Sequence, residues 1–224
     1  MDEPALVDAA RGGDREAFNR LVVHYQSLAY NVAFRILSDP DAAADATQDA
    51  FISAYRAMPR FRGGSFRSWL LRIVTNACYD QLRAKKRRPT TSLDADPDID
   101  WEEWTVDDGE RPEEFAERQA LSQVIQQGLE ALPDDQRTVI VLSDIQGLRY
   151  GEIAEALGIS LGTVKSRLNR GRRKLQDLLQ GHMELLPARY RLYDRGGGGA
   201  GVMSWLAGWV TDYCVARLLR RETD

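Results

Sequence analysis

The sequence has few of the residues from which metal sites and disulfide frameworks are built. Among its 224 residues there are two cysteines and two histidines. Cys78 and Cys214 lie in unrelated surroundings without a CxxC spacing, and His24 and His182 are isolated. A zinc site or a disulfide framework is therefore not expected. We predict no metal, no cofactor and a reducing, cytoplasmic setting.

The sequence also lacks the side-chain groupings of common catalytic sites. It shows no paired carboxylates, no Ser/His/Asp set and no phosphate-binding loop, so we expect a protein that binds rather than one that catalyses. No signal peptide is expected, because residues 1–15 are polar and acidic.

The net charge of −4 looks wrong for a protein that binds nucleic acid. The charges are unevenly distributed, however. Between Ser92 and Glu117, twelve carboxylates stand against one arginine, which leaves a net charge of +7 on the rest of the chain. A basic protein with an acidic insert is compatible with nucleic-acid binding.

The spacing of apolar residues predicts helices and no strand of useful length. Apolar residues recur at three- and four-residue steps from Phe18 to Ile36, which predicts an amphipathic helix. Asp39 and Pro40 predict the start of a second helix, over about residues 41–58. Ser65 is expected to cap a third helix that ends in a basic run. We therefore predict an all-α fold.

Two small helical domains are predicted. The first covers residues 1–88 and the second residues 113–180. Between them, residues 89–112 have no apolar periodicity and many acids, so we expect a flexible linker. Residues 181–224 form a C-terminal extension.

The second domain contains the pattern of a helix-turn-helix, in residues 152–160 followed by residues 163–168. Ala154 provides a small side chain where two helices cross, and Gly158 tolerates the positive φ of a tight turn. Ser160 is a suitable cap for the second helix, which would be the recognition helix.

Four polar side chains of the predicted recognition helix avoid its apolar face: Lys165, Ser166, Asn169 and Arg172. Arginine and lysine bind guanine edges or phosphates, and asparagine binds adenine. The alternative is a solvated basic face on a core helix. The complete crossing pattern favours DNA binding.

The third helix of the first domain carries a second polar stripe, at steps of four, three and four residues: Arg72, Asn76, Tyr79 and Arg83. Basic, amide and aromatic side chains together suit phosphates and unstacked bases. A solvated helix face with incidental arginines explains the spacing equally well.

Several motifs, in order along the chain, resemble those of bacterial sigma factors. Residues 45–51 (DATQDAF), 61–70 (FRGGSFRSWL) and 72–83 resemble sigma region 2, and residues 132–175 resemble sigma region 4. Two such domains joined only by a linker resemble the extracytoplasmic-function (ECF) group, over about residues 5–180.

The resemblance implies roles for these surfaces. The clamp of the largest subunit of core RNA polymerase would be bound by Asp45, Gln48, Asp49 and Phe51. The flap of the polymerase would be a further contact of the chain. The stripe around Asn76 would capture a flipped base and melt the −10 element. The recognition helix would bind the −35 element of promoter DNA, and the linker would pass near the active-site channel. Alternatively, Asp45 and Asp49 only solvate an outer helix face.

Two other functions remain open at this point. In a stand-alone operator-binding regulator, residues 1–88 would serve for dimerisation or sensing. In an adaptor, the chain would bind polymerase without promoter specificity. The stripe around Asn76 argues against the regulator, because a regulator needs no melting surface, and the recognition helix argues against the adaptor.

The extension, residues 181–224, matches no family pattern. Glycines at 196–199 precede an apolar stretch, residues 202–219, that includes Trp205 and Trp209. This stretch is too short and too charged for a membrane span. We expect it to dock on the chain's own sigma domains, on a protein partner such as an anti-sigma factor, or on a membrane surface. Docking on protein is favoured.

Overall fold

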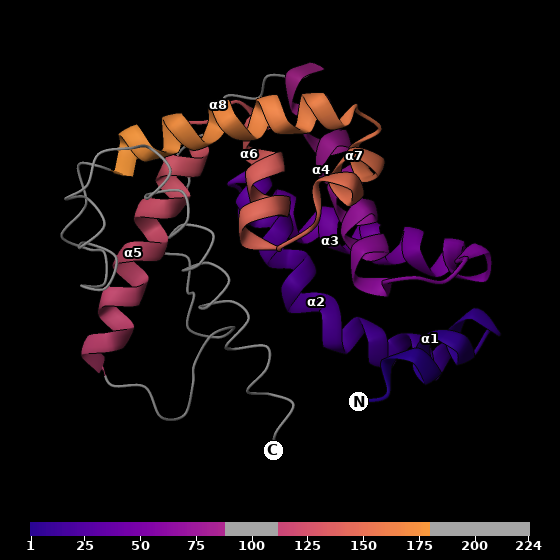
Figure 1. Ribbon diagram of the computed structural model, residues 1–224. Helices are drawn as coiled ribbons and strands as arrows, with labels where there is room; N and C mark the ends of the chain where they lie inside the picture. Colours follow the sequence, from indigo (N-terminus) through magenta and orange to yellow (C-terminus); the bar gives the residue numbers. More distant parts are fainter. Residues whose placement is uncertain (88–111, 180–224) are drawn as a thin grey trace. The chain divides into compact units, whose positions relative to one another are not determined.

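The structure is a computed structural model, and it describes residues 1–87 and 112–179 (Figure 1). All regular structure within these two ranges is helical, which confirms the predicted all-α fold. The chain divides into two compact units, with the first four α-helices in one and most of the remaining helices in the other. Nearly all of the predicted linker and the whole C-terminal extension lie outside the described residues.

The first unit contains four α-helices and a short 3₁₀ turn. They are α1 (Glu3–Arg11), α2 (Arg15–Leu37), α3 (Pro40–Ala57), the 3₁₀ turn Met58–Arg60 and α4 (Phe66–Arg87). The predicted starts of two helices are confirmed by capping contacts. The Asp39 carboxylate accepts a hydrogen bond from the amide of Ala42 at 3.0 Å, and the Ser65 hydroxyl accepts one from the amide of Ser68 at 3.1 Å.

Helix α1 was not expected from the sequence. Asp2 caps it by accepting a hydrogen bond from the amide of Ala5, and Pro4 lies in its first turn. It packs on α2, and the Tyr25 hydroxyl of α2 donates a hydrogen bond to Oε2 of Glu3 at 2.6 Å. Burial, reinforced by this contact, raises the pKa of Tyr25 above its ordinary value.

An aromatic cluster fixes the beginning of α4. The ring of Phe66 lies 5.4 Å from that of Tyr25 and 5.5 Å from that of Trp69, and Trp69 lies 5.0 Å from Phe61. Such pairs stabilise by about 0.5–1.5 kcal/mol each beyond simple burial. They bind the turn before α4 to α2 and so determine which face of α4 is turned outward.

The fully buried residues of helix α3 are all alanines. Its buried residues are Ala43, Ala46, Ala50 and Ala54, each fully inaccessible to solvent. Because alanine side chains are small, α3 approaches its neighbours closely. The larger side chains of α3 lie on its half-buried and exposed sides.

The second unit contains α5 (Pro112–Glu130), α6 (Asp134–Ile140), a π-helical turn (Val141–Ile145), α7 (Tyr150–Leu157) and α8 (Leu161–Leu179). Its core includes Leu129, Ile140, Ile153, Val164 and Leu168, each at most 2 % exposed. None of the helices in the two described ranges is long and apolar enough to cross a membrane.

Two glycines allow α8 to pack closely on its neighbours. A Cβ at Gly171 would lie 2.8 Å from Cδ1 of Ile140 in α6, and a Cβ at Gly128 in α5 would lie 2.7 Å from Cδ1 of Leu175 in α8. Neither position has room for a side chain without movement of its neighbour. The helix that carries the predicted recognition surface is therefore held by contacts in which a side chain of one helix packs directly on a glycine of the other.

Buried Arg137 joins α5 to α6. Its guanidinium donates hydrogen bonds to the carbonyls of Leu129 at 2.8 Å, Glu130 at 3.0 Å and Leu132 at 3.1 Å. Burial lowers the pKa of Arg137, and Asp134 and Glu130 oppose that shift. The contacts satisfy carbonyls at the end of α5 that have no partner within the helix.

The single cysteine of the described residues, Cys78, has no ligand or disulfide partner and is buried in α4. Burial raises the pKa of its thiol to about 12, so the thiolate is scarce at neutral pH. Cys214 lies outside the described residues.

Removal of the Tyr25 hydroxyl tests how α1 is held. Tyr25→Phe retains the ring but loses the hydrogen bond to Glu3, and we expect the free energy of unfolding to fall by about 1 kcal/mol. Urea titration of the full chain measures this change. Tyr55→Phe is the control, since Tyr55 is 46 % exposed, and an equal loss in both variants would contradict the assignment.

Candidate nucleic-acid interfaces

The turn between α7 and α8 has the geometry of a helix-turn-helix. Gly158 has φ +62°, in the left-handed region, as the sequence predicts. The amide of Ile159 donates to the carbonyl of Ala154 at 3.1 Å. The buried side chains of α7 are Ile153 and Ala156, whereas Ala154, which the sequence places at the crossing, is half-buried.

Side chains cap both helices of the motif. The Ser160 hydroxyl accepts a hydrogen bond from the amide of Thr163 at 3.1 Å, as predicted, and shares a second one with the Thr163 hydroxyl at 2.8 Å. Glu152 accepts a hydrogen bond from the amide of Arg149 at 2.8 Å. These contacts satisfy amides that have no partner within a helix, so the start of α8 is well defined.

Three of the four predicted recognition residues are exposed on α8: Lys165, Ser166 and Asn169. Two arginines that the sequence reasoning did not single out, Arg170 and Arg173, share this outward side. The signal was present, because both arginines continue the three- and four-residue spacing from Ser166. We call these five residues the outward stripe of α8.

Arg172, the fourth predicted residue, has a different environment. Its Nε donates to Oδ2 of Asp144 at 2.9 Å, and its Nη2 donates to Oδ1 at 2.5 Å. The side chain of Arg172 is 23 % exposed and that of Asp144 only 7 %. The hydrogen bond to Asp144 holds the pKa of Arg172 above its ordinary value, against the effect of burial. The guanidinium is thus occupied by a carboxylate of the protein itself.

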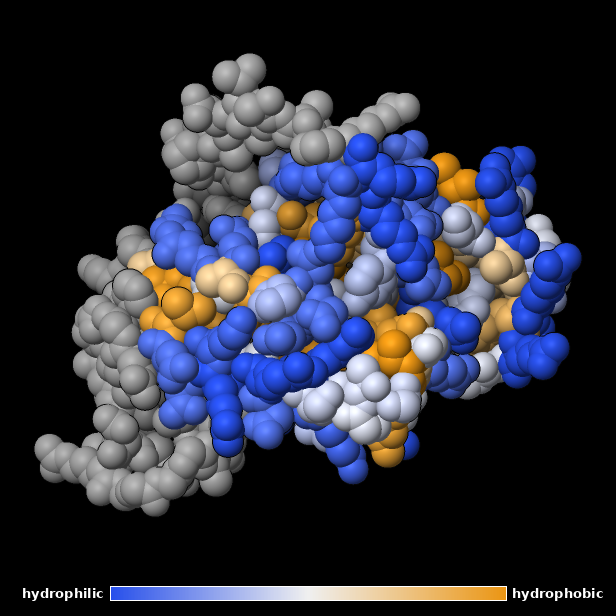
Figure 2. All heavy atoms as spheres, turned by 90° about the horizontal axis from the view of Figure 1, so that it is seen from above, coloured by the Kyte–Doolittle hydropathy of each residue, from blue (hydrophilic) through white to orange (hydrophobic). Residues whose placement is uncertain are grey.

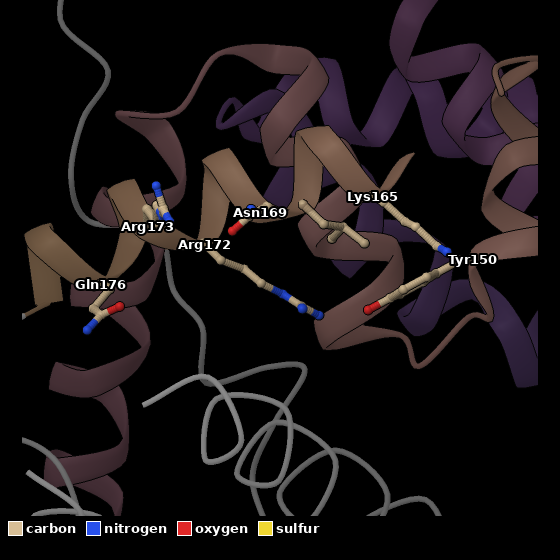
Figure 3. A pocket seen from close by; sticks show the side chains of 7 residues that line it. Tyr150, Lys165, Asn169, Arg172, Arg173 and Gln176 are labelled. Carbon is tan, nitrogen blue, oxygen red and sulfur yellow. The ribbon is translucent and has the colours of Figure 1, made fainter. Parts of the chain in front are cut away.

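A shallow hollow of about 400 Å³ lies along one edge of α8 (Figure 3). It is lined by Tyr150, Lys165, Leu168, Asn169, Arg172, Arg173 and Gln176. In Figure 3, Arg172 and the hydroxyl of Tyr150 point toward one another. Ser166 does not line the hollow, and its hydroxyl donates to the carbonyl of Thr163 at 3.0 Å. Figure 2 shows mainly hydrophilic atoms between smaller apolar areas.

The predicted stripe of the first unit lies on α4. Arg72, Asn76 and Arg83 are exposed, and Tyr79 is half-buried. Arg83 forms an ion pair with Asp80 at 3.2 Å, and both side chains are largely exposed, so the pair contributes little to stability. Opposite this stripe, α4 buries its apolar side chains in the unit.

The predicted polymerase-binding residues lie on α3. Asp45, Gln48 and Asp49 are exposed on the side opposite the buried alanines, whereas Phe51 is half-buried. Two apolar side chains that the sequence reasoning missed, Ile52 and Tyr55, are 41 % and 46 % exposed and continue the same side. Their spacing from Asp45 and Gln48 is the signal that could have identified them.

Within residues 1–87 and 112–179, no group of three or more His, Cys, Asp or Glu side chains could hold a metal ion. The surfaces that stand out there are the polar stripes of α4 and α8 and the mixed outer side of α3.

Family models match both units. Residues 21–88 match the model for Sigma-70 region 2. Residues 122–175 match the model for Sigma-70 region 4. The order of the two matches is the order that the sequence motifs predict.

Curated relatives resemble the chain over most of their length. The RNA polymerase sigma-H factor of Pseudomonas aeruginosa is 37 % identical over 178 residues, which cover 78 % of this chain and 92 % of that protein. The ECF RNA polymerase sigma-E factor of Escherichia coli K12 is 37 % identical over 183 residues, or 80 % of this chain and 95 % of that protein.

Solved structures agree with these matches. CnrH, in complex with the cytosolic domain of CnrY, is 30 % identical with a TM-score of 0.56, over 81 % of this chain and 99 % of that one. The sigma factor RpoE of Bartonella quintana, in complex with the anti-sigma factor NepR, is 26 % identical with a TM-score of 0.56. That match covers 73 % of this chain and 96 % of RpoE.

Loss of the Ser160 cap should loosen the start of α8. We expect Ser160→Ala to lower the free energy of unfolding by about 1 kcal/mol and to speed hydrogen exchange at the amide of Thr163. Ser53→Ala, on the exposed side of α3, is the control. Unchanged exchange in Ser160→Ala would show that the hydroxyl does not hold the helix start.

Proposed function

The chain belongs to the sigma-70 family, within its ECF group, and on that premise we propose that its two units divide promoter recognition between them. It is a transcription initiation factor that directs RNA polymerase to promoters. The chain supplies promoter specificity and the polymerase supplies the chemistry. The alternative of a stand-alone regulator is set aside, because the similarity to sigma factors extends through both regions.

We assign recognition of the −35 element to the outward stripe of α8, and this stripe is the observation that carries the proposal. Lys165 and Asn169 are suited to base edges in the major groove, and Arg170 and Arg173 to phosphates. Their exposure on a capped, closely packed helix supports the assignment. Arg172 is excluded from the direct contacts, because its guanidinium is engaged by Asp144.

We assign melting of the −10 element to the α4 stripe. Unpaired bases are held by stacking and by hydrogen bonds to their exposed edges, and extraction of a base costs a few kcal/mol. Asn76 supplies donors and an acceptor, Tyr79 a ring, and Arg72 and Arg83 positive charge. The aromatic cluster that fixes the start of α4 supports this assignment, because it holds the stripe in place.

We assign the contact with the polymerase clamp to the outer side of α3. Asp45 and Asp49 complement a basic partner, and the neighbouring Ile52 and Tyr55 provide apolar area for the centre of an interface. A surface with charge at one end and exposed apolar side chains at the other is more typical of a protein-binding site than of a face exposed only to solvent. Phe51 is half-buried and so contributes less exposed area to this surface.

Two similar proteins were solved with protein partners, RpoE with the anti-sigma factor NepR and CnrH with the cytosolic domain of CnrY. We propose that an anti-sigma factor also binds this chain when it is not bound to polymerase. The chain would act in the cytoplasm, where polymerase and promoter DNA are found.

The division of labour between α4 and α8 is tested with one variant from each. Asn76→Ala should impair strand opening and Lys165→Ala should weaken binding to the upstream duplex, by about 1–3 kcal/mol for a base-reading contact. Permanganate reactivity and transcript yield are measured with holoenzyme on duplex and on pre-melted promoters. Pre-melting should restore Asn76→Ala and leave Lys165→Ala impaired, and equal rescue of both would refute the division.

The polymerase surface is tested by truncation of one exposed apolar side chain. Ile52→Ala should weaken binding to core polymerase by about tenfold, since burial of such a side chain is worth about 1.5–3 kcal/mol. Competition against a labelled wild-type chain measures the affinity. Val23→Ala is the matched control, because Val23 on α2 is 68 % exposed and off the α3 surface. Equal affinities of the two variants would place the contact elsewhere.

A further inference from the structure

The carboxylate of Asp144 lies in an unusual stretch of backbone. Asp144 belongs to the π-helical turn after α6, in which the amide of Gln146 donates to the carbonyl of Val141 at 3.0 Å. Gly147 then ends the turn with φ +68°. A π turn shifts the following side chains around the helix axis, and such turns are frequent at functional sites. Asp144 is the one charged residue of this turn, and its side chain is 7 % exposed.

The contact between Asp144 and Arg172 depends strongly on orientation. Both carboxylate oxygens are used, one by Nε and one by Nη2. This fork-to-fork arrangement forms only when the two side-chain planes are aligned. It joins the turn after α6 to the middle of α8, across 28 residues of sequence.

At two points in the packing of α8, an apolar side chain of one helix lies directly against a glycine of the other. Ile140 of α6 packs its Cδ1 against Gly171 of α8, and Leu175 of α8 packs its Cδ1 against Gly128 of α5. Apolar contacts of this kind set the distance between helices, but they are not directional, so they specify the rotation of α8 about its own axis less sharply than a pair of aligned hydrogen bonds does. The ion pair lies one residue from Gly171, where it restrains that rotation.

We propose that Asp144 and Arg172 are positioning residues, whose ion pair sets the rotation of α8 and thereby the presentation of its outward stripe to the −35 duplex. The inference rests on the proposed function of α8. Buried ion pairs are weak contributors to stability compared with apolar packing, and their best-supported use is to specify one arrangement over others. Arg172 then acts on DNA recognition through the orientation of Lys165 and Asn169.

The positioning role and direct contact of Arg172 with DNA predict opposite changes in DNA affinity when the charge of Asp144 is removed. If Arg172 contacted DNA, Asp144 would compete with DNA for the guanidinium, and removal of its charge would strengthen binding. If the pair positions α8, removal of that charge weakens binding. Lysine in place of Arg172 separates the two as well, because it retains the charge for a phosphate but cannot form the fork.

The test uses the holoenzyme and a duplex that spans the −35 element of a promoter it selects from a genomic library. The affinity for this duplex is measured at several salt concentrations for the single variants Asp144→Asn, Arg172→Gln and Arg172→Lys. The double variant that combines Asp144→Asn with Arg172→Gln is measured in the same way. We expect each single variant to lose about tenfold in affinity and the double variant to lose no more, as for residues in one network. Asp177→Asn, an exposed acid on α8, controls for the change in charge.

The salt dependence distinguishes positioning from contact. A lost phosphate contact lowers the slope of log affinity against log salt by about 0.9. We expect that decrease for Arg173→Gln and an unchanged slope for Arg172→Gln. Circular dichroism at the assay temperature confirms folding, and Arg172→Lys decides the question if Asp144→Asn does not fold.

Stronger or unchanged binding by Asp144→Asn, wild-type affinity of Arg172→Lys, or a lowered slope for Arg172→Gln would overturn the positioning role. These results differ from failure of the proposed function, in which the wild-type holoenzyme would select no promoter from the library.

Discussion

Close helix packing through alanine and glycine is the constraint on which both units depend. Helix α3 enters its core with four alanines, and α8 crosses its neighbours at Gly171 and opposite Gly128. Large side chains at these points would push the helices apart. The small residues at these points let the helices pack closely, and the outer sides of the same helices carry basic and acidic side chains.

This arrangement separates the residues that hold a helix from those that contact a partner. On α8, Leu168 and Arg172 face the protein, and Asn169 and Arg170 face outward. A rigid helix is useful for DNA recognition, because base contacts tolerate only small displacements. Buried Arg137 also makes the second unit more rigid, because its hydrogen bonds join α5 to α6.

The fold was largely predictable because it follows from local signals. Asp39, Ser65, Gly158 and Ser160 occupy the caps and turns that the sequence indicates. Helix α1 was missed although its Asp2 cap and Pro4 were visible. The role of Arg172 could not be predicted from the spacing of one helix, because its partner lies 28 residues earlier. Phe51 and Ile52 are neighbours in the sequence and point to different sides of α3. Which of the two is exposed depends on how α3 packs.

The central claim is that this chain recognises promoters as part of RNA polymerase, because each unit presents only a small DNA surface. The most direct measurement is footprinting of a selected promoter with the chain alone, with core polymerase alone and with both together. We predict a sequence-specific footprint and a melted −10 element only in the combined reaction. Tight, sequence-specific protection of the duplex by the chain alone would contradict the account.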